Sequence, residues 1–307
     1  AIGIGCTNPQ VTSDCSVYFR VCFLDPFQGS VMASFAMEEF GAKKAYVLSM
    51  LGDDYTVGLA KNFVIAFEAA GGEIVADETF VEGTADFSAY LNNAVAGGAD
   101  VIFAPSAIAY APQIIEQASA LGISLPILGG DTWENSAISD AQNGTDMQVF
   151  VSTFFDENDE SGLAKEFVTG YKAWLNGNSQ NLTNNGGNDV VAAVSALGYD
   201  AYMTAVAAIE KAQSADGSAI ESESLLSRLP AFSRTAKIPD RRIFRIPFAA
   251  EKERPRLRAP GTGVRKGSVF RVRSARSRGC SRENGLRMVL GTFCHQKVQS
   301  LRGIRRG

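Results

Sequence analysis

Short apolar runs alternate with helically spaced apolar residues along residues 17–140. The runs VYFRVCF, AYVLSM, EIVADETF, DVIFAP and LPILGG have the length and composition of buried strands. Between them, apolar residues recur three or four positions apart, which predicts amphipathic helices. The first helix is expected to start with Asp25 as its cap and Pro26 in its first turn, and to end at Gly41. Its predicted buried face is Phe27, Val31, Phe35, Met37 and Phe40.

The order of these elements predicts an α/β fold. Strands start near residues 45, 73, 100 and 125, a spacing of roughly 25–30 residues that suits βαβ units. Such units form a doubly wound, Rossmann-like parallel sheet with helices on both faces, and ligands bind at the carboxyl ends of its strands. The helix before the last of these strands is expected to bury Ile114, Ile115, Ala118 and Leu121.

The pattern changes after residue 140. QVFVSTFF (148–155) predicts a strand that crosses toward another lobe. Two helical stretches follow at 162–176 and 190–212, and the polar segment NGNSQNLTNNGGND between them predicts a loop.

Charge divides the chain near residue 232. Up to Phe232 there are 8 Lys and Arg against 29 Asp and Glu, whereas from Ser233 onward there are 21 against 4. Only two arginines precede Ser233 and 17 follow it. Two different compositions are therefore joined in one chain, and each has to be interpreted by itself.

The residue inventory argues against an enzyme. The single histidine, His295, lies in the basic part, so the acidic part has no imidazole for a general base or a metal site. None of the five cysteines has a CxxC spacing, and we expect buried, inert thiols because Cys22 lies in an apolar run. The segment Gly3–Asn8 begins like a dinucleotide-binding loop but lacks its third glycine. The sequence therefore predicts neither a metal nor a cofactor.

A family resemblance rests on several motifs in order. CTNPQVTSDCSVYFRVCFLDPFQGSVMASFA, DDYTVGLAKNF, GTADFSAYLNNAVAGGADVIFAPS, LPILGGDTWENS and SALGYDAYMTAVAAIEKA resemble segments of type I periplasmic binding proteins, in particular the branched-chain amino-acid receptors of ABC transporters. The resemblance covers residues 1–232 and implies a two-lobed clamp, incomplete here because the family starts well before Ala1. It implies the end of the first lobe and a crossover in 1–22, the second lobe in 23–152, and the second crossover with first-lobe helices in 153–232.

The same resemblance implies where a ligand would bind. Gly5 and Thr7 match the segment whose backbone N–H groups and hydroxyl hold the ligand α-carboxylate. Tyr55 and the pair Ser106 and Ala107 match cleft positions. Asp131 matches the acid that pairs with the ligand ammonium. A buried cation requires such a carboxylate partner. Three of these positions also have a simpler explanation: Thr7 as a turn cap, Tyr55 packed locally, and Asp131 as the cap of a helix over 132–140.

The resemblance implies a small amino acid, branched-chain by preference, as ligand and a membrane permease as partner. Relatives place an aromatic pair where this chain has Ala107 and Ile108, so Tyr110 is a candidate replacement. The protein is expected to be a monomer in the periplasm or on the cell surface as a lipoprotein, with no nucleic-acid partner. A ligand-sensing regulatory domain of the same fold, for amides or other small polar ligands, is the alternative.

The basic segment 233–307 has two interpretations. Its arginine clusters could bind nucleic acid by releasing counterions from phosphates. Alternatively, its Arg, Gly, Ser and Pro content is what a GC-rich gene yields when translated out of frame, and the family pattern stops abruptly at LLSRLPAF. We prefer the frameshift and expect a poorly ordered tail with no fixed packing on the core.

Overall fold

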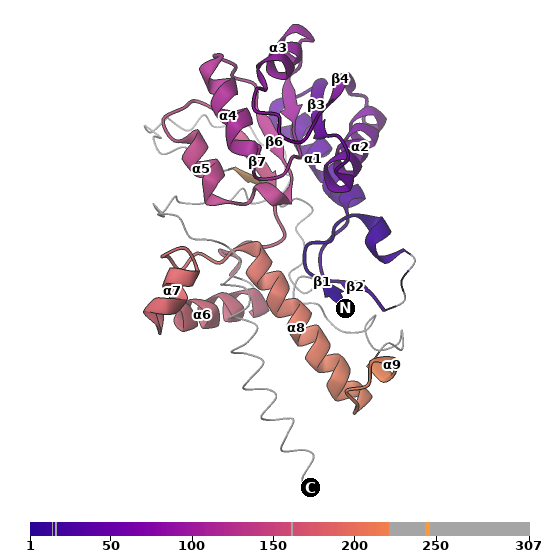
Figure 1. Cartoon of the computed structure of the whole chain (residues 1–307), viewed down its shortest axis with the longest axis vertical. Coiled ribbons are helices and arrows are strands. Elements are labelled where there is room, and N and C mark those ends of the chain that lie inside the picture. Colours follow the sequence, from indigo (N-terminus) through magenta and orange to yellow (C-terminus); the bar gives the residue numbers. More distant parts are fainter. Residues whose placement is uncertain (14, 16, 161, 221–242, 246–307) are drawn as a thin grey trace, which may run out of the picture.

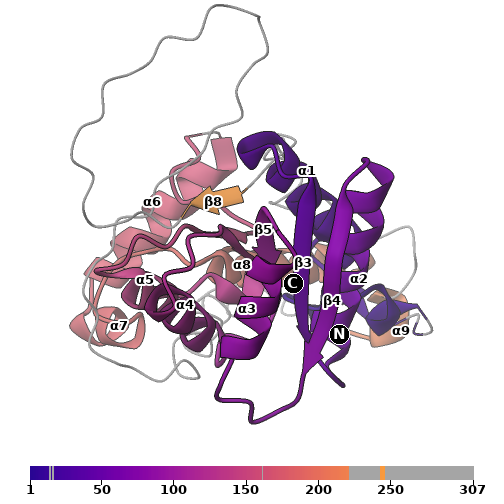
Figure 2. The ribbon, with the colours of Figure 1, turned by 90° about the horizontal axis from the view of Figure 1, so that it is seen from above.

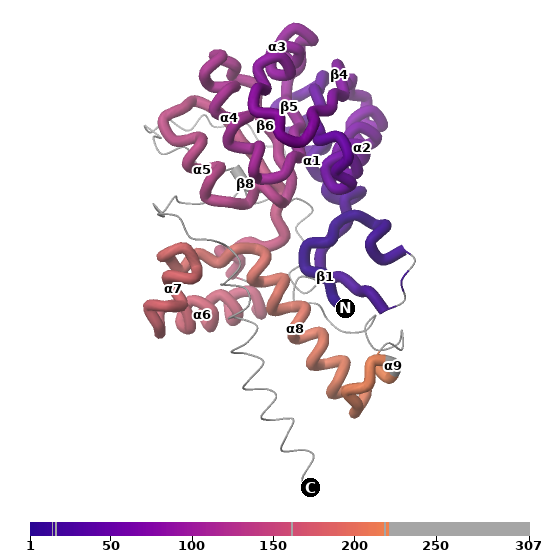
Figure 3. Tube along the Cα trace, viewed as in Figure 1, coloured from indigo at the N-terminus to yellow at the C-terminus, as the bar shows by residue number. Residues whose placement is uncertain are grey.

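A computed structural model describes residues 1–13, 15, 17–160, 162–220 and 243–245. These residues form two bodies (Figure 1). We call residues 24–152 with 243–245 the sheet body, and residues 1–23 with 153–220 the helical body. The chain passes between them just before the first long helix and again after the fifth strand of the sheet body (Figure 3).

The sheet body is organised by one six-stranded sheet. Its strand order is β4-β3-β5-β6-β7-β8, and every neighbouring pair except β7 with β8 is parallel. The predicted α/β fold with a parallel sheet is therefore confirmed. The strands are β3 (Lys44–Met50), β4 (Glu73–Phe80), β5 (Val101–Phe103), β6 (Ile127–Gly129), β7 (Val149–Ser152) and β8 (Ile243–Arg245).

Helices cover both faces of this sheet, so its central strands are buried on both sides (Figure 2). On one face Phe63 stacks on Phe103 with ring centroids 4.2 Å apart. On the other face Trp133 is fully buried. The helices of the first face are α1 (Asp25–Phe40) and α2 (Asp54–Ala69), and those of the second are α3 (Ser88–Ala96), α4 (Ala111–Ala120) and α5 (Ser136–Gln142).

The inward face of α1 differs from the prediction. Phe27 is 44% exposed, and the buried stripe includes Gln28 and Met32, which were not predicted, together with Phe35, which was. The close approach of α2 decides this orientation, because a Cβ added to Gly29 would lie only 2.7 Å from the backbone of α2. Asp25 is the first residue of the helix rather than its cap. The prediction for Leu121 is also wrong, since it caps α4 and is 41% exposed.

The helical body has little sheet. The strand predicted at 17–23 is only β2 (Phe19–Arg20), which pairs with β1 (Ile2–Gly3). The strand predicted at 148–155 is only β7. The segment predicted as a polar loop contains a short helix, α7, whose cap Asn178 accepts a hydrogen bond from Gln180 N. The remaining elements are the 3-10 helix η1 (Pro9–Thr12) and the helices α6 (Gly162–Asn176), α7 (Ser179–Asn184), α8 (Ala193–Ala212) and α9 (Gly217–Ile220).

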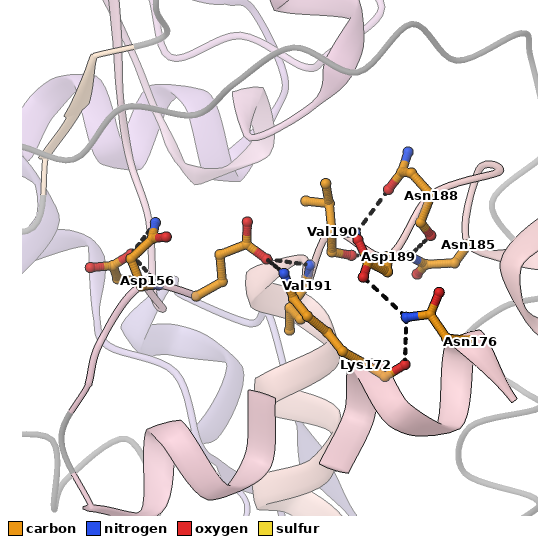
Figure 4. Close-up of polar contacts among 10 residues, drawn as sticks. Asp156, Lys172, Asn176, Asn185, Asn188, Asp189, Val190 and Val191 are labelled. Carbon is orange, nitrogen blue, oxygen red and sulfur yellow. Dashed lines mark hydrogen bonds and ion pairs between the residues drawn. The ribbon is translucent and has the colours of Figure 1, made fainter. Parts of the chain in front are cut away.

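Polar contacts fix the turn that leads into α8 (Figure 4). Glu157 Oε2 accepts a hydrogen bond from Val191 N at 3.0 Å and pairs with Lys172 Nζ at 3.1 Å. Asn176 Nδ2 donates to Asp189 Oδ2 at 3.1 Å. The end of α6 and the chain after β7 therefore hold the start of α8 from two sides.

Part of the basic tail packs on the sheet. Ile243–Arg245 form β8, which pairs antiparallel with β7, so the expectation that no part of the tail would pack is wrong for these residues. An IFR run has strand propensity, and β7 offers a free edge. The remainder of the predicted tail lies outside the described residues. In the described part of the chain no helix is long and apolar enough to cross a membrane.

Three cysteines lie in the described residues, and they are less buried than predicted, whereas Cys280 and Cys294 lie outside those residues. Cys15 is exposed, and Cys6 and Cys22 are half-buried, because their segments lie beside the two-residue strands β1 and β2 rather than inside a sheet. Burial nevertheless raises the pKa of Cys22 to about 11, which keeps this thiol protonated and unreactive at neutral pH.

Candidate functional site

Asp131 lies at the carboxyl end of a central parallel strand. It follows β6 and begins the 3-10 helix η2 (Asp131–Trp133). Its Oδ1 accepts hydrogen bonds from Tyr55 Oη at 2.7 Å and from Gln28 Nε2 at 2.7 Å. Both side-chain donors reach the same oxygen, and among the described residues none occupies Oδ2. The carboxylate is thus held in place with one oxygen still available.

Among the described residues, no cationic side chain pairs with this carboxylate. Burial raises the pKa of Asp131 to about 6, the Tyr55 hydrogen bond opposes this rise, and the Asp25 carboxylate nearby adds to it. Burial and the Asp131 charge also keep the pKa of Tyr55 well above its usual range, so Tyr55 is a hydrogen-bond donor. At neutral pH Asp131 is ionised, and a cation would stabilise it.

Two glycines shape the turn that presents Asp131. A Cβ on Gly130 would lie 2.3 Å from the Tyr55 hydroxyl, and a Cβ on Gly129 would lie 2.4 Å from the Trp133 ring. The predicted capping role of Asp131 belongs instead to Asn135, whose side chain accepts a hydrogen bond from Ala137 N at 2.9 Å at the start of α5. The structure therefore contradicts the helix-cap explanation of Asp131.

The segment after β5 is fixed against η2. The Ser106 carbonyl accepts hydrogen bonds from Thr132 Oγ1 at 3.0 Å and from Trp133 Nε1 at 2.8 Å. Ser106 is fully buried, and its hydroxyl has no partner among the described residues. Ala107 beside it is half-buried. The predicted positions that follow β5 and β6 thus lie together at the carboxyl ends of these two strands.

Tyr110, the candidate replacement ring, is engaged elsewhere. Its ring lies edge-on to Phe80, with centroids 5.0 Å apart, and its hydroxyl accepts a hydrogen bond from Gly83 N at 3.1 Å. The ring therefore completes the core beside α3, whereas the predicted site residues Ser106 and Asp131 meet at η2.

The Gly5–Thr7 segment is anchored by an arginine. The guanidinium of Arg20 donates hydrogen bonds to the carbonyls of Cys6, Asn8 and Pro9, the second of them at 2.8 Å. Because these three carbonyls all bind Arg20, the backbone of the N-terminal loop is held in one conformation. Gly5 is exposed, and a Cβ there would meet no atom within 4 Å. Open space beside the backbone is what a close approach by a ligand requires.

Thr7 lies against a buried acid. It is 1% exposed, and its carbonyl accepts a hydrogen bond from Asp25 N at 3.0 Å. Burial raises the pKa of Asp25, while the Thr7 hydroxyl and the positive charge of Arg20 oppose that rise. Thr7 therefore links the N-terminal loop to α1, and its role as a ligand contact stays a prediction.

The N-terminal loop and the Asp131 network meet at the starts of α1 and α2. Asn8 Nδ2 donates to the Asp54 carbonyl at 3.2 Å, one residue before Tyr55. The sequence analysis did not identify Gln28 or Arg20. For Gln28 a signal existed, because a glutamine four residues before Met32 falls on the apolar stripe of α1, where a polar side chain needs a partner.

The chain also matches a known protein family. The family model described as "Periplasmic binding protein" matches residues 6–250. The chain belongs to the periplasmic binding protein family. Members of this family bind solutes and are not enzymes. The matched range extends past Phe232, where the sequence analysis placed the end of the resemblance.

Three periplasmic binding proteins of known name are similar to this chain. The Leu/Ile/Val-binding protein homolog 3 of Brucella melitensis is 27% identical over 220 residues, which are 71% of this chain and 56% of that protein. The structure of the leucine binding protein LivK of Thermotoga maritima is 34% identical, with a TM-score of 0.64, and the match covers 72% of this chain and 59% of that one. The substrate binding protein LivJ of Streptococcus pneumoniae, solved with isoleucine, is 28% identical with a TM-score of 0.60 and the same coverage.

This chain spans somewhat more than half the length of these periplasmic binding proteins. The names of the three refer to leucine alone, to leucine, isoleucine and valine, or to branched-chain amino acids. In the described part of the chain, no three His, Cys, Asp or Glu side chains are grouped so that they could hold a metal ion.

Proposed function

We propose that this chain is part of the substrate-binding component of an ABC transporter and that it binds an amino acid between two lobes. The observation that carries the proposal is Asp131, a half-buried carboxylate just after β6 whose Oδ1 is held by two donors. An ammonium group placed at Oδ2 would compensate the buried charge. The family membership supplies the context in which such a site binds a solute.

The opposite end of the ligand is assigned to the N-terminal loop. Backbone N–H groups around Gly5, with the Thr7 hydroxyl, would bind the α-carboxylate without a counter-charge. The positive charge of Arg20 behind the loop would favour the anion further. Tyr55 would complete the ammonium side, and Ser106 and Ala107 would contact the part of the ligand near η2.

A branched-chain amino acid is the preferred ligand. One relative is named a leucine binding protein and another was solved with isoleucine. The small side chain of Ala107 and the engagement of Tyr110 in the core favour an aliphatic group over a stacked aromatic ring. Leucine, isoleucine and valine are therefore the first ligands to test.

The lobes, the partner and the location belong to the same proposal. Residues 23–152 would form one lobe, while residues 1–22 and 153–232 would contribute to the other and to the crossovers. A loaded monomer would deliver its amino acid to a membrane permease from the periplasm or the cell surface, without a nucleic-acid partner.

Calorimetry with matched ligands tests the proposal. Leucine should bind, whereas 4-methylpentanoate, which lacks the ammonium, should bind on the order of 30- to several-thousand-fold more weakly, because the ligand would cover Asp131 without supplying a counter-charge. Asp131→Asn should reduce leucine affinity by a similar factor, and Asn135→Ala, which removes the α5 cap, should leave it unchanged.

Two results would contradict the amino-acid assignment. One is equal binding of leucine and 4-methylpentanoate to the unaltered chain. The other is tight binding of a neutral amide such as butyramide together with no binding of any amino acid, which would favour the ligand-sensing alternative.

A further inference from the structure

Gln28 is a polar side chain on the buried stripe of α1. It is 1% exposed, and its Nε2 donates to Asp131 Oδ1 at 2.7 Å and to Ser152 Oγ at 2.8 Å. An amide nitrogen carries two hydrogens, so both are used. The reversed amide orientation would place Oε1 against a carboxylate oxygen, which is repulsive. The network therefore determines which end of the amide faces Asp131.

The two acceptors of Gln28 belong to neighbouring strands. Asp131 follows β6, and Ser152 is the last residue of β7, after which the chain leaves the sheet body. The next residue, Thr153, donates to Glu134 Oε2 at 2.6 Å, and Glu134 Oε1 accepts from Ala193 N at the start of α8. Gln28 thus connects Asp131 to the end of β7, the point at which the chain leaves the sheet body.

We propose that Gln28 is a positioning residue for ligand binding: with Tyr55 it fixes Asp131 Oδ1 and turns Oδ2 toward the ligand ammonium, while it ties this acid to the strand that leaves the sheet body. This inference rests on the proposed function, because it assigns Asp131 to the ammonium.

Two donors from two helices restrict the carboxylate more than one would. Tyr55 reaches Oδ1 from α2 and Gln28 reaches it from α1. A single donor would leave the carboxylate free to rotate about its terminal torsion, which is broad in Asp. The space is also tight, since a Cβ on Gly130 would lie 3.3 Å from Gln28 Nε2. Gln28 therefore has little freedom to move away from Asp131.

The ligand-free titration of Asp131 gives a test that does not depend on binding. The titratable groups near Asp131 are Tyr55 on α2, Asp25 on α1 and Cys22 before α1. Gln28→Met keeps the size of the side chain and removes the donor that stabilises the charged form. The carboxyl ¹³C resonance of Asp131, followed by NMR in the full chain, should then titrate at higher pH than in the unaltered protein.

Calorimetry with leucine gives the second readout. Gln28→Met should weaken leucine binding roughly ten- to hundredfold at about pH 7.5, the range expected for a hydrogen bond to a charged group. The loss of affinity on acidification should also begin at higher pH. Gln142→Met is the matched control, because Gln142 is 2% exposed and its Nε2 donates to the Met147 carbonyl instead. The control should leave both the Asp131 titration and leucine affinity unchanged.

The outcomes separate the two proposals. An unchanged Asp131 titration in Gln28→Met overturns the role of Gln28, whether or not leucine binds. If Asp131→Asn abolishes leucine binding while Gln28→Met binds normally, the proposed function stands and the inference fails. Should Gln28→Met not fold, Gln28→Leu removes the same donor with a smaller side chain and adds no charge. The Asp131 titration must then also move to higher pH, and an unshifted titration overturns the inference.

Discussion

The two bodies of this molecule are stabilised in different ways. In the sheet body, helices cover both faces of the sheet, and most of the aromatic residues of its core, such as Phe63 and Phe103, have no exposed surface. In the helical body, one smaller core around Phe167 and Tyr171 is built from segments at opposite ends of residues 1–220. Its only strands among the described residues are two residues long. A continuous chain segment that completes its own core should fold more cooperatively than one assembled from distant segments.

Deleting a large side chain from each core should give the largest difference. Phe63→Ala should lower the free energy of unfolding of the sheet body by about 3–5 kcal/mol, because it leaves a cavity beside Phe67 and Phe103. Phe167→Ala should lower the free energy of unfolding of the helical body by less, because the side chains of that smaller core can move in to fill the cavity more easily. The chain has two tryptophans, Trp133 in the sheet body and Trp174 in the helical body. Urea unfolding followed by the fluorescence of each tryptophan, with the other replaced by Phe, measures both.

The same urea experiment also tests whether the two bodies unfold separately. We expect Trp174 to report unfolding at lower urea than Trp133, and Phe63→Ala to shift only the Trp133 transition. If the two transitions coincide in every variant, the two bodies unfold as one cooperative unit and do not differ in stability.

The buried acid of the sheet body should lower stability where it is ionised. Because the pKa of Asp131 is raised to about 6 in the folded chain, ionising it costs folding free energy above that pH, and the cost fades as pH falls toward 3.8. Asp131→Asn should therefore stabilise the ligand-free protein by about 1–3 kcal/mol near pH 7.5. Thermal unfolding of both proteins at several pH values checks this. A gain that persists below pH 4 would point to packing rather than charge.

Two glycines inside helices should respond in opposite directions. Gly29→Ala should destabilise the protein by about 1–3 kcal/mol, because its Cβ would lie 2.7 Å from the backbone of α2. Gly170→Ala in α6 meets no atom within 4 Å and should stabilise the protein by about 0.5–1 kcal/mol through helix propensity. Thermal midpoints of the two variants provide the measurement. Equal effects of the same sign would mean that the helices of the two bodies are packed alike.

Much of the fold could be predicted from local pattern. Strand and helix order, the parallel sheet and the position of Asp131 after β6 follow from hydrophobic periodicity and from the regular βαβ spacing. These features depend on residues near one another in the chain, so a single sequence contains them. The family resemblance added the candidate positions Gly5, Thr7, Tyr55, Ser106 and Ala107, whose role in binding stays a prediction.

Other features were decided only by tertiary packing. Asp25 and Gln28 are inward because α2 approaches α1 at Gly29, and Phe27 is outward for the same reason. Asn135 rather than Asp131 caps α5, since Asp131 is already bound by side chains 76 and 103 positions earlier in the chain. The pairing of β8 with β7 likewise joins distant segments. Contacts at such separations leave no periodic signal, because they depend on how the elements meet in space and not on the order of residues within any one of them.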